Sequence, residues 1–177
     1  MSDQSTRLSQ LVDAEGGRLY ALLTRLTLRR DVADELLQEL VVRLGQSEGF
    51  RRADDPLAYA RRAAIHLAFD WRRGGKRRRR TEPLVEEPAV FPPDALGKLV
   101  DREELERALA AMDRLSSSSR SCLVLHYIEQ LSYGEMAEQL QMTPHQVRAA
   151  CHKAIRRIQK ILGAEPSNPA PKEAGDE

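Results

Sequence analysis

The chain has 177 residues, of which 28 are basic and 27 acidic, so its formal net charge is only +1. This length predicts one or two small domains, and no apolar run reaches the length needed to cross a bilayer. The first ten residues, MSDQSTRLSQ, lack the apolar centre of a secretory signal peptide, so we expect a cytoplasmic protein without membrane insertion.

Helices dominate the prediction for the whole chain, because β-branched residues are sparse and no segment alternates convincingly between apolar and polar residues. A polar N-terminal segment over residues 1–14 comes first. Leucines on one face then predict a helix from Gly16 or Gly17 to about Leu28. Together with the elements that follow, this favours an all-α fold.

A second helix is predicted after Asp31, which can serve as its N-cap, with an apolar stripe that runs from Val32 to Leu44. The next stretch, 45–54, is polar and is predicted to be a loop. Among the aromatic residues of the chain, Phe50 in this loop is the one least expected in the core.

Asp55 and Pro56 predict the start of a long helix, with Asp as the cap and Pro at the first helical position. Gly74-Gly75 is predicted to end or bend it. For Tyr59, Phe69 and Trp71 we favour core packing, because aromatic side chains dominate small cores. The segment 71–80 has seven basic residues and no acid, and its candidates for phosphate contacts are Arg72, Arg73, Lys76 and Arg77–Arg80.

Residues 15–80 are thus predicted to form one helical domain, and residues 101–163 a second. Between them, 81–100 is an acidic, Pro-rich linker, and the tail 164–177 has a disordered composition. Two basic segments on either side of an acidic connector suggest a polyanionic partner that is contacted at two places. Cys122 and Cys151 fall on apolar helix faces and are predicted to be buried thiols.

The most informative segment is 131–157, which holds two short helix signals and a four-residue turn between them. Ser132 with Glu135, and Thr143 with Gln146, each have the spacing of a capping box. Pro144 stands at the first position of the second helix. This is the layout of a DNA-binding helix-turn-helix.

The second of these helices has two faces. Val147, Cys151, Ile155, Ile158 and Leu162 recur at spacings of three and four and form an apolar stripe. A helix of this kind can offer its other side to a major groove, although a basic, solvated helix is the alternative. The residues off the stripe that we expect to contact DNA are His145, Gln146, Arg148, Ala149, His152, Lys153 and Arg156.

Taken in order, these segments resemble the extracytoplasmic-function sigma factors, small two-domain specificity subunits of bacterial RNA polymerase. Residues 31–40 look like the segment of region 2 that docks on the polymerase, and 59–73 look like its promoter-melting helix. Residues 125–137 and 147–154 look like region 4, which binds the upstream promoter element. The order of the segments makes the resemblance specific, because many bacterial regulators carry a similar helix-turn-helix.

The resemblance implies roles for further residues. It assigns polymerase docking to Asp34, Glu35, Gln38 and Glu39, and recognition and melting of the downstream (−10) element to Arg61, Arg62, His66 and Asp70 together with the loop before the long helix. The helix-turn-helix would recognise the upstream (−35) element. The implied partners are core RNA polymerase, promoter DNA and an anti-sigma protein.

The chain departs from the family pattern at several positions. Ile65-His66 and Ala149-Ala150 replace Arg-Asn and Ser-Arg, which alters candidate DNA contacts. Leu28, Gln130 and Gln141 stand where turns of the family have Gly, so each is predicted to adopt a left-handed conformation, at a cost of about 1 kcal/mol, or a different turn.

Two alternatives to a sigma factor stay open from the sequence. One is a freestanding helix-turn-helix regulator that binds a palindromic site as a dimer. The other is an inactive, sigma-like protein that binds polymerase or an anti-sigma protein without melting DNA. An enzyme is not expected, since the histidines and cysteines lack metal-ligand spacing and the chain has no Gly-rich phosphate loop; no cofactor is predicted.

Overall fold

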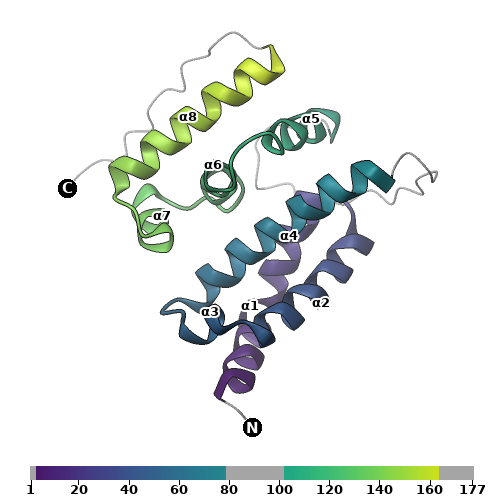
Figure 1. Cartoon of the computed structure of the whole chain (residues 1–177), viewed down its shortest axis with the longest axis vertical. Coiled ribbons are helices and arrows are strands. Elements are labelled where there is room, and N and C mark those ends of the chain that lie inside the picture. Colours follow the sequence, from purple (N-terminus) through teal and green to yellow (C-terminus); the bar gives the residue numbers. More distant parts are fainter. Residues whose placement is uncertain (1–2, 79–101, 164–177) are drawn as a thin grey trace.

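The computed structural model describes residues 3–78 and 102–163, and over these ranges all regular elements are helices (Figure 1). The prediction of an all-α fold is therefore confirmed. The predicted linker and the C-terminal tail lie outside the described residues.

The first helix, α1 (Asp3–Thr27), is much longer than the sequence suggested. It runs through Gly16 and Gly17, so the predicted start at these glycines is wrong, and the described part of the polar segment 1–14 is helical. The reason is packing: Leu8 and Leu11 extend the leucine stripe towards the N-terminus and lie against the core. That burial offsets the cost of about 1 kcal/mol for each helical glycine.

The second helix, α2 (Arg30–Gln46), has Arg29 at its N-cap, and no side chain caps it. The prediction that Asp31 is the cap is wrong. Asp31 lies in the first turn instead, where it accepts a hydrogen bond of 3.1 Å from Nε of Arg29. A carboxylate in the first turn still interacts favourably with the helix dipole.

The predicted polar loop over 45–54 is also wrong, because α2 continues to Gln46 and a short helix, α3 (Glu48–Arg52), follows directly. The side chain of Phe50 has no exposed surface. Phe50 therefore belongs to the core, against expectation, and its burial holds this otherwise polar segment on the domain.

The long helix α4 (Pro56–Arg78) starts as predicted, with Oδ1 of Asp55 accepting a 2.9 Å hydrogen bond from the backbone N–H of Ala58. It does not end at Gly74-Gly75. Phe69 is fully buried and Trp71 is half-buried against the core, in line with the packing expected for them. α1, α2 and α4 pack on one another and form the N-terminal half.

The C-terminal half contains α5 (Arg102–Met112), α6 (Ser117–Leu123), the π-helical turn η1 (Val124–Ile128), α7 (Tyr133–Leu140) and α8 (Pro144–Leu162). Arg120 is buried and donates hydrogen bonds to the carbonyls of Met112 (3.2 Å) and Leu115 (3.0 Å). Met112 is the last residue of α5 and Leu115 lies in the turn after it, so Arg120 serves carbonyls at a helix C-terminus.

Cys122 on α6 and Cys151 on α8 are buried free thiols, as predicted. The neighbouring thiol of Cys122, together with burial, raises the pKa of Cys151. The two thiols add to the packing of α6 on α8.

Leu28, Gln130 and Gln141 have φ angles of 60°, 59° and 53°. The predicted left-handed conformation is confirmed at all three positions. Leu28 directly follows α1, Gln141 directly follows α7, and Gln130 follows the end of η1 after one intervening residue. Glycine would carry no steric cost at these positions.

The two halves pack on each other, with α4 lying against α6 (Figure 1). The guanidinium of Arg120 lies 4.6 Å from the ring centroid of Phe69, across the contact between the halves. The buried apolar residues of both halves form one continuous cluster.

Candidate nucleic-acid interface

The helix-turn-helix of α7 and α8 has both predicted capping boxes. The backbone N–H of Glu135 donates to Oγ of Ser132 (3.3 Å), and the N–H of Ser132 donates to the Glu135 carboxylate (2.8 Å). The same pair of bonds joins Thr143 and Gln146, at 3.2 and 2.8 Å. The bonds from Ser132 also hold the pKa of Glu135 below its usual value.

The conformation of the turn between the two helices is fixed by a left-handed residue and a backbone hydrogen bond. Gln141 takes the left-handed conformation after α7, and the N–H of Met142 donates to the carbonyl of Ala137 at 3.0 Å. Two residues on, Thr143 caps α8 with Pro144 at the first position. The start of α8 is thereby fixed relative to α7.

The faces of α8 divide largely as predicted. Val147 and Cys151 are buried and Ala154 joins them, whereas Ile155 and Ile158 are only partly buried, and Leu162 is 47% exposed. The seven predicted DNA-contacting residues are all exposed and start at the N-terminal end of the helix: His145, Gln146, Arg148, Ala149, His152, Lys153 and Arg156.

The sequence did not reveal that Arg148 rests on the ring of Tyr133, which in turn stacks on His126. The guanidinium of Arg148 lies 5.3 Å from the ring centroid of Tyr133, a cation–π contact. On α7, Tyr133 stacks on His126 with 4.6 Å between ring centroids, and Nδ1 of His126 lies 2.9 Å from the carbonyl oxygen of Leu131. The only sequence signal was an aromatic residue directly after the Ser132 cap.

The predicted DNA contacts on α4 fall on two different faces. His66, Asp70 and Arg73 are exposed and Arg62 is partly exposed, and their spacing places these four on one stripe. The guanidinium of Arg73 pairs with Asp70 on the same helix. The side chains of Lys76 and Arg77 lie outside the described residues.

Arg61 and Arg72 point instead towards the C-terminal half. Nε of Arg61 lies 3.6 Å from the carboxylate of Glu129, which also pairs with Arg25 at 3.6 Å. Arg72 is buried, and its guanidinium pairs with Glu106 at 2.9 Å and with Asp113 at 3.8 Å. In this conformation both arginines face carboxylates.

The four predicted docking residues on α2, Asp34, Glu35, Gln38 and Glu39, are all exposed. Val42 lies one turn further along the same side and is 58% exposed, the highest value among the large apolar residues that the structure describes. Its position off the buried stripe of α2 was the available sequence signal. The outer face of α2 thus combines acidic groups with an apolar side chain.

Within residues 3–78 and 102–163 no group of three or more histidine, cysteine or acidic side chains is arranged to hold a metal ion. Among the helices described, none is both long and apolar enough to span a membrane.

Two family profiles match the chain, one on each half. Residues 11–78 match Sigma-70 region 2, and residues 105–158 match Sigma-70, region 4. The second match contains α7 and α8 as far as residue 158, and the first contains α2, α3 and α4.

Curated relatives match across both halves. The chain is 35% identical over 135 residues to an RNA polymerase sigma-E factor of Streptomyces antibioticus, which covers 73% of this chain and 70% of the relative. It is 24% identical over 162 residues to the ECF RNA polymerase sigma factor SigX of Bacillus subtilis, covering 86% and 81% of the two chains.

Solved structures share the fold. CnrH, determined with the cytosolic domain of CnrY, matches 93% of this chain and 92% of its own, with a TM-score of 0.52 and 20% identity. The sigma factor RpoE of Bartonella quintana, determined with the anti-sigma factor NepR, covers 89% and 98% with a TM-score of 0.50. Both matches extend over the two helical halves. With regions 2 and 4 present in order and a curated relative matched over most of its length, the chain belongs to the extracytoplasmic-function sigma factors of bacterial RNA polymerase.

Proposed function

We propose that the chain directs core RNA polymerase to specific promoters, with α8 on the upstream element and α4 with α3 on the downstream element. The observation that carries this assignment is the exposure of all seven candidate side chains on α8, which two capping boxes and a fixed turn hold in place. The protein works in the cytoplasm, by binding and strand separation rather than by catalysing a change of bonds.

On α8, base contacts belong to the first two turns and phosphate contacts to the later ones. Arg148 can pair bidentately with a guanine. Oε1 of Gln146 already accepts the N–H of Thr143, so its Nε2 is the group that can donate to a base. Lys153 and Arg156 reach phosphates, and His145, Ala149 and His152 complete the surface next to the groove.

On α4, the stripe of Arg62, His66, Asp70 and Arg73 faces solvent and can lie along the downstream element. The basic run that follows, including Lys76 and Arg77, adds phosphate contacts that position the DNA without specifying its sequence. Arg61 and Arg72 can join this set only when the carboxylates of the C-terminal half move away from them.

The outer face of α2 is the proposed docking surface for polymerase. Asp34, Glu35, Gln38 and Glu39 supply negative charge, and the exposed Val42 supplies an apolar contact. A basic groove with an apolar floor is the complementary partner. The neighbour RpoE, solved with the anti-sigma factor NepR, makes an anti-sigma protein a further proposed partner.

Run-off transcription with purified bacterial core polymerase and a library of upstream fragments tests the proposal. We expect start sites that appear only when the protein is added. Absence of transcripts, with the protein still bound to polymerase, would point to an inactive, sigma-like interaction protein. Absence of both, with tight binding to a palindromic site, would point to a freestanding regulator.

A further inference from the structure

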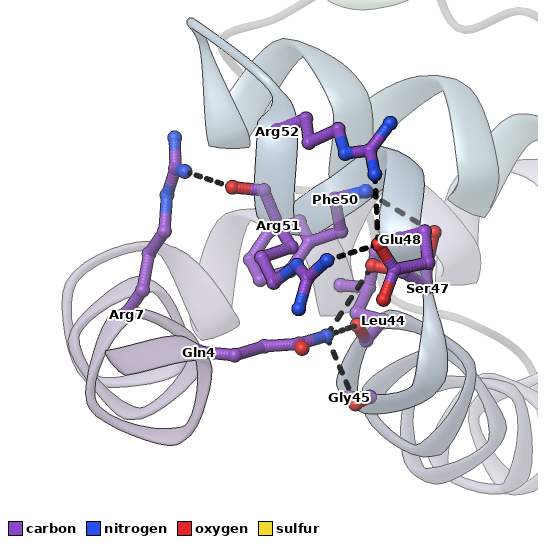
Figure 2. Close-up of polar contacts among 9 residues, drawn as sticks. All are labelled: Gln4, Arg7, Leu44, Gly45, Ser47, Glu48, Phe50, Arg51 and Arg52. Carbon is purple, nitrogen blue, oxygen red and sulfur yellow. Dashed lines mark hydrogen bonds and ion pairs between the residues drawn. The ribbon is translucent and has the colours of Figure 1, made fainter. Parts of the chain in front are cut away.

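The first two turns of α1 hold the junction between α2 and α4 through bonds from side chains to the backbone. Figure 2 shows Gln4 and Arg7 reaching from α1 to the end of α2 and to α3. Every acceptor is a backbone carbonyl between residues 44 and 53. The contact therefore constrains the path of this segment rather than any one of its side chains.

Gln4 closes the C-terminus of α2. Its Nε2 lies within hydrogen-bonding distance of the carbonyls of Leu44 (3.1 Å), Gly45 (2.9 Å) and Ser47 (3.3 Å). Leu44 and Gly45 lie in the last turn of α2, whose carbonyls have no partner within the helix, and the Gln4 amide reaches both. The carbonyl of Ser47 also accepts the N–H of Arg51, at 3.1 Å.

Arg7 does the same for α3. Its Nη1 donates to the carbonyl of Arg51 at 2.9 Å, and its Nη2 donates to the carbonyl of Ala53. The guanidinium also lies 5.8 Å from the ring centroid of the buried Phe50. One planar fork thus fixes the end of α3 and the residue after it, a geometry that a lysine cannot reproduce.

The other end of α3 is fixed by α4. Oγ of Ser47 accepts the N–H of Phe50 at 3.1 Å and lies 2.8 Å from the hydroxyl of Tyr59. A Cβ atom on Gly49 would stand 2.7 Å from that hydroxyl, so only glycine allows this approach. Held at both ends, α3 keeps a defined orientation with respect to α4.

The bonds from Gln4, Arg7 and Tyr59 form a frame that holds the segment 47–55. The side chains that this segment presents to solvent are polar. The side chains of Glu48, Arg51 and Arg52 are 63%, 50% and 77% exposed, and Asp54 and Asp55 are exposed as well. Glu48 pairs with both arginines, with 3.5 Å to Arg52. The groups are suited to holding the edge of an unstacked base together with its phosphate.

We propose that Gln4 and Arg7 are positioning residues for the downstream promoter element: they fix the segment 47–55 in the orientation in which it discriminates an unstacked base. The inference rests on the proposed function, in which this segment contacts the downstream element. Both residues precede residue 11, where the match to Sigma-70 region 2 begins, so that family match does not include them.

The experiment measures base discrimination in transcription by the reconstituted holoenzyme. Templates carry each single-base replacement across the upstream and downstream elements that run-off transcription defines. The variants are Gln4→Glu, which keeps size but replaces the donor by an acceptor, and Arg7→Ala and Arg7→Lys. With one or two hydrogen bonds lost, we expect discrimination to fall about five-fold at one downstream position in each variant.

Two matched controls separate positioning from charge and from stability. Arg18→Ala removes an α1 arginine that pairs with Glu15 of its own helix, so it changes charge without touching the frame. Leu11→Ala removes a buried side chain of the same helix and lowers the stability of the fold, but it leaves the hydrogen bonds of Gln4 and Arg7 in place. Both controls should keep the discrimination of the wild type, and thermal unfolding of every variant shows that the chain is folded at the assay temperature.

Discrimination at the upstream element, and affinity for core polymerase, should not change in the Gln4 and Arg7 variants. Wild-type discrimination at every downstream position in these variants, with the wild-type protein active, would overturn the positioning role and leave the proposed function standing. Equal loss in Leu11→Ala would also overturn it, because a general loosening of α1 would then be sufficient. No transcription by the wild-type holoenzyme would overturn both.

Discussion

The guanidinium of Arg148 lies 5.3 Å from the ring centroid of Tyr133, so the main base-reading candidate of α8 rests on a side chain of α7. An arginine that is free in solution has several rotamers, and fixing one of them costs entropy on binding. The ring reduces that cost by holding the guanidinium near the exposed start of α8.

Replacement of Arg148 should lower affinity for the upstream element selectively. Because a bidentate contact to a guanine is worth about 1–3 kcal/mol, Arg148→Ala should lose this amount on the preferred sequence and relax the preference at one base pair. Lys153→Ala should weaken binding to all sequences alike and reduce the salt dependence by about one phosphate contact. Fluorescence anisotropy of the holoenzyme on short duplexes measures both; the same uniform loss in both variants would rule out base recognition by Arg148.

Replacement of Tyr133 should act through Arg148. Tyr133→Leu removes the ring and should weaken binding of the upstream element by about 0.5–1 kcal/mol, the value of a partly exposed cation–π contact. Tyr133→Phe keeps the ring and should bind as the wild type does. In the Arg148→Ala background, Tyr133→Leu should have no further effect, which a double-mutant cycle in the same assay tests.

Replacement of a left-handed residue by glycine should change the stability of the fold in a direction that depends on how deeply the residue is buried. Gln141 is exposed, so Gln141→Gly should stabilise the fold by about 0.5–1 kcal/mol through relief of backbone strain. Leu28 is only 3% exposed, so Leu28→Gly should destabilise it by about 1–4 kcal/mol, because the lost burial exceeds the relief. Urea denaturation measures both.

A suitable control for the glycine series is Glu138→Gly, an exposed position within α7. There, glycine should cost about 1 kcal/mol, as in any helix interior. Destabilisation by Gln141→Gly of the same size would mean that residue 141 does not take the left-handed conformation in solution.

The adjacent arginines 72 and 73 should differ sharply in their contribution to stability. The side chain of Arg72 is 3% exposed and that of its partner Asp113 is 5% exposed, so Arg72→Ala leaves a buried carboxylate and should cost about 3–5 kcal/mol. Arg73 is half-exposed and pairs with Asp70, one turn earlier on α4, so Arg73→Ala should cost less than about 1 kcal/mol. Urea unfolding measures the stability of both variants. Equal unfolding midpoints for Arg72→Ala and Arg73→Ala would show that the two halves are not packed on each other in solution.

The fold of the C-terminal half could be predicted in detail because its signals are local. The capping boxes at Ser132 and Thr143 depend on residues three positions apart, and they appear in the structure as expected. The left-handed conformations at Gln130 and Gln141 were expected for a different reason, because turns of the resembling family have glycine at these positions.

Predictions for the N-terminal half were wrong where tertiary contacts outweighed the local preference of the sequence. Phe50 lies in a polar stretch, yet it is buried because α1 and α4 provide its cavity. The pairing of Arg61 with Glu129 joins residues that are far apart in the sequence, and no periodicity predicts it. The candidate DNA contacts on α4 were therefore identified as one set, although they lie on two faces.

Ser47 is at once the last cap of α2 and the first cap of α3, and it alone separates the two helices. With no further residues between them to absorb a rotation, a turn of α2 about its axis moves α3 in step. Under the proposed function, α2 contacts polymerase and α3 contacts DNA, so this single residue is a rigid connection between the two contact surfaces. The geometry of docking is then transmitted to the separated strand through Ser47, in addition to the bonds by which Gln4 and Arg7 hold α2 and α3 on α1.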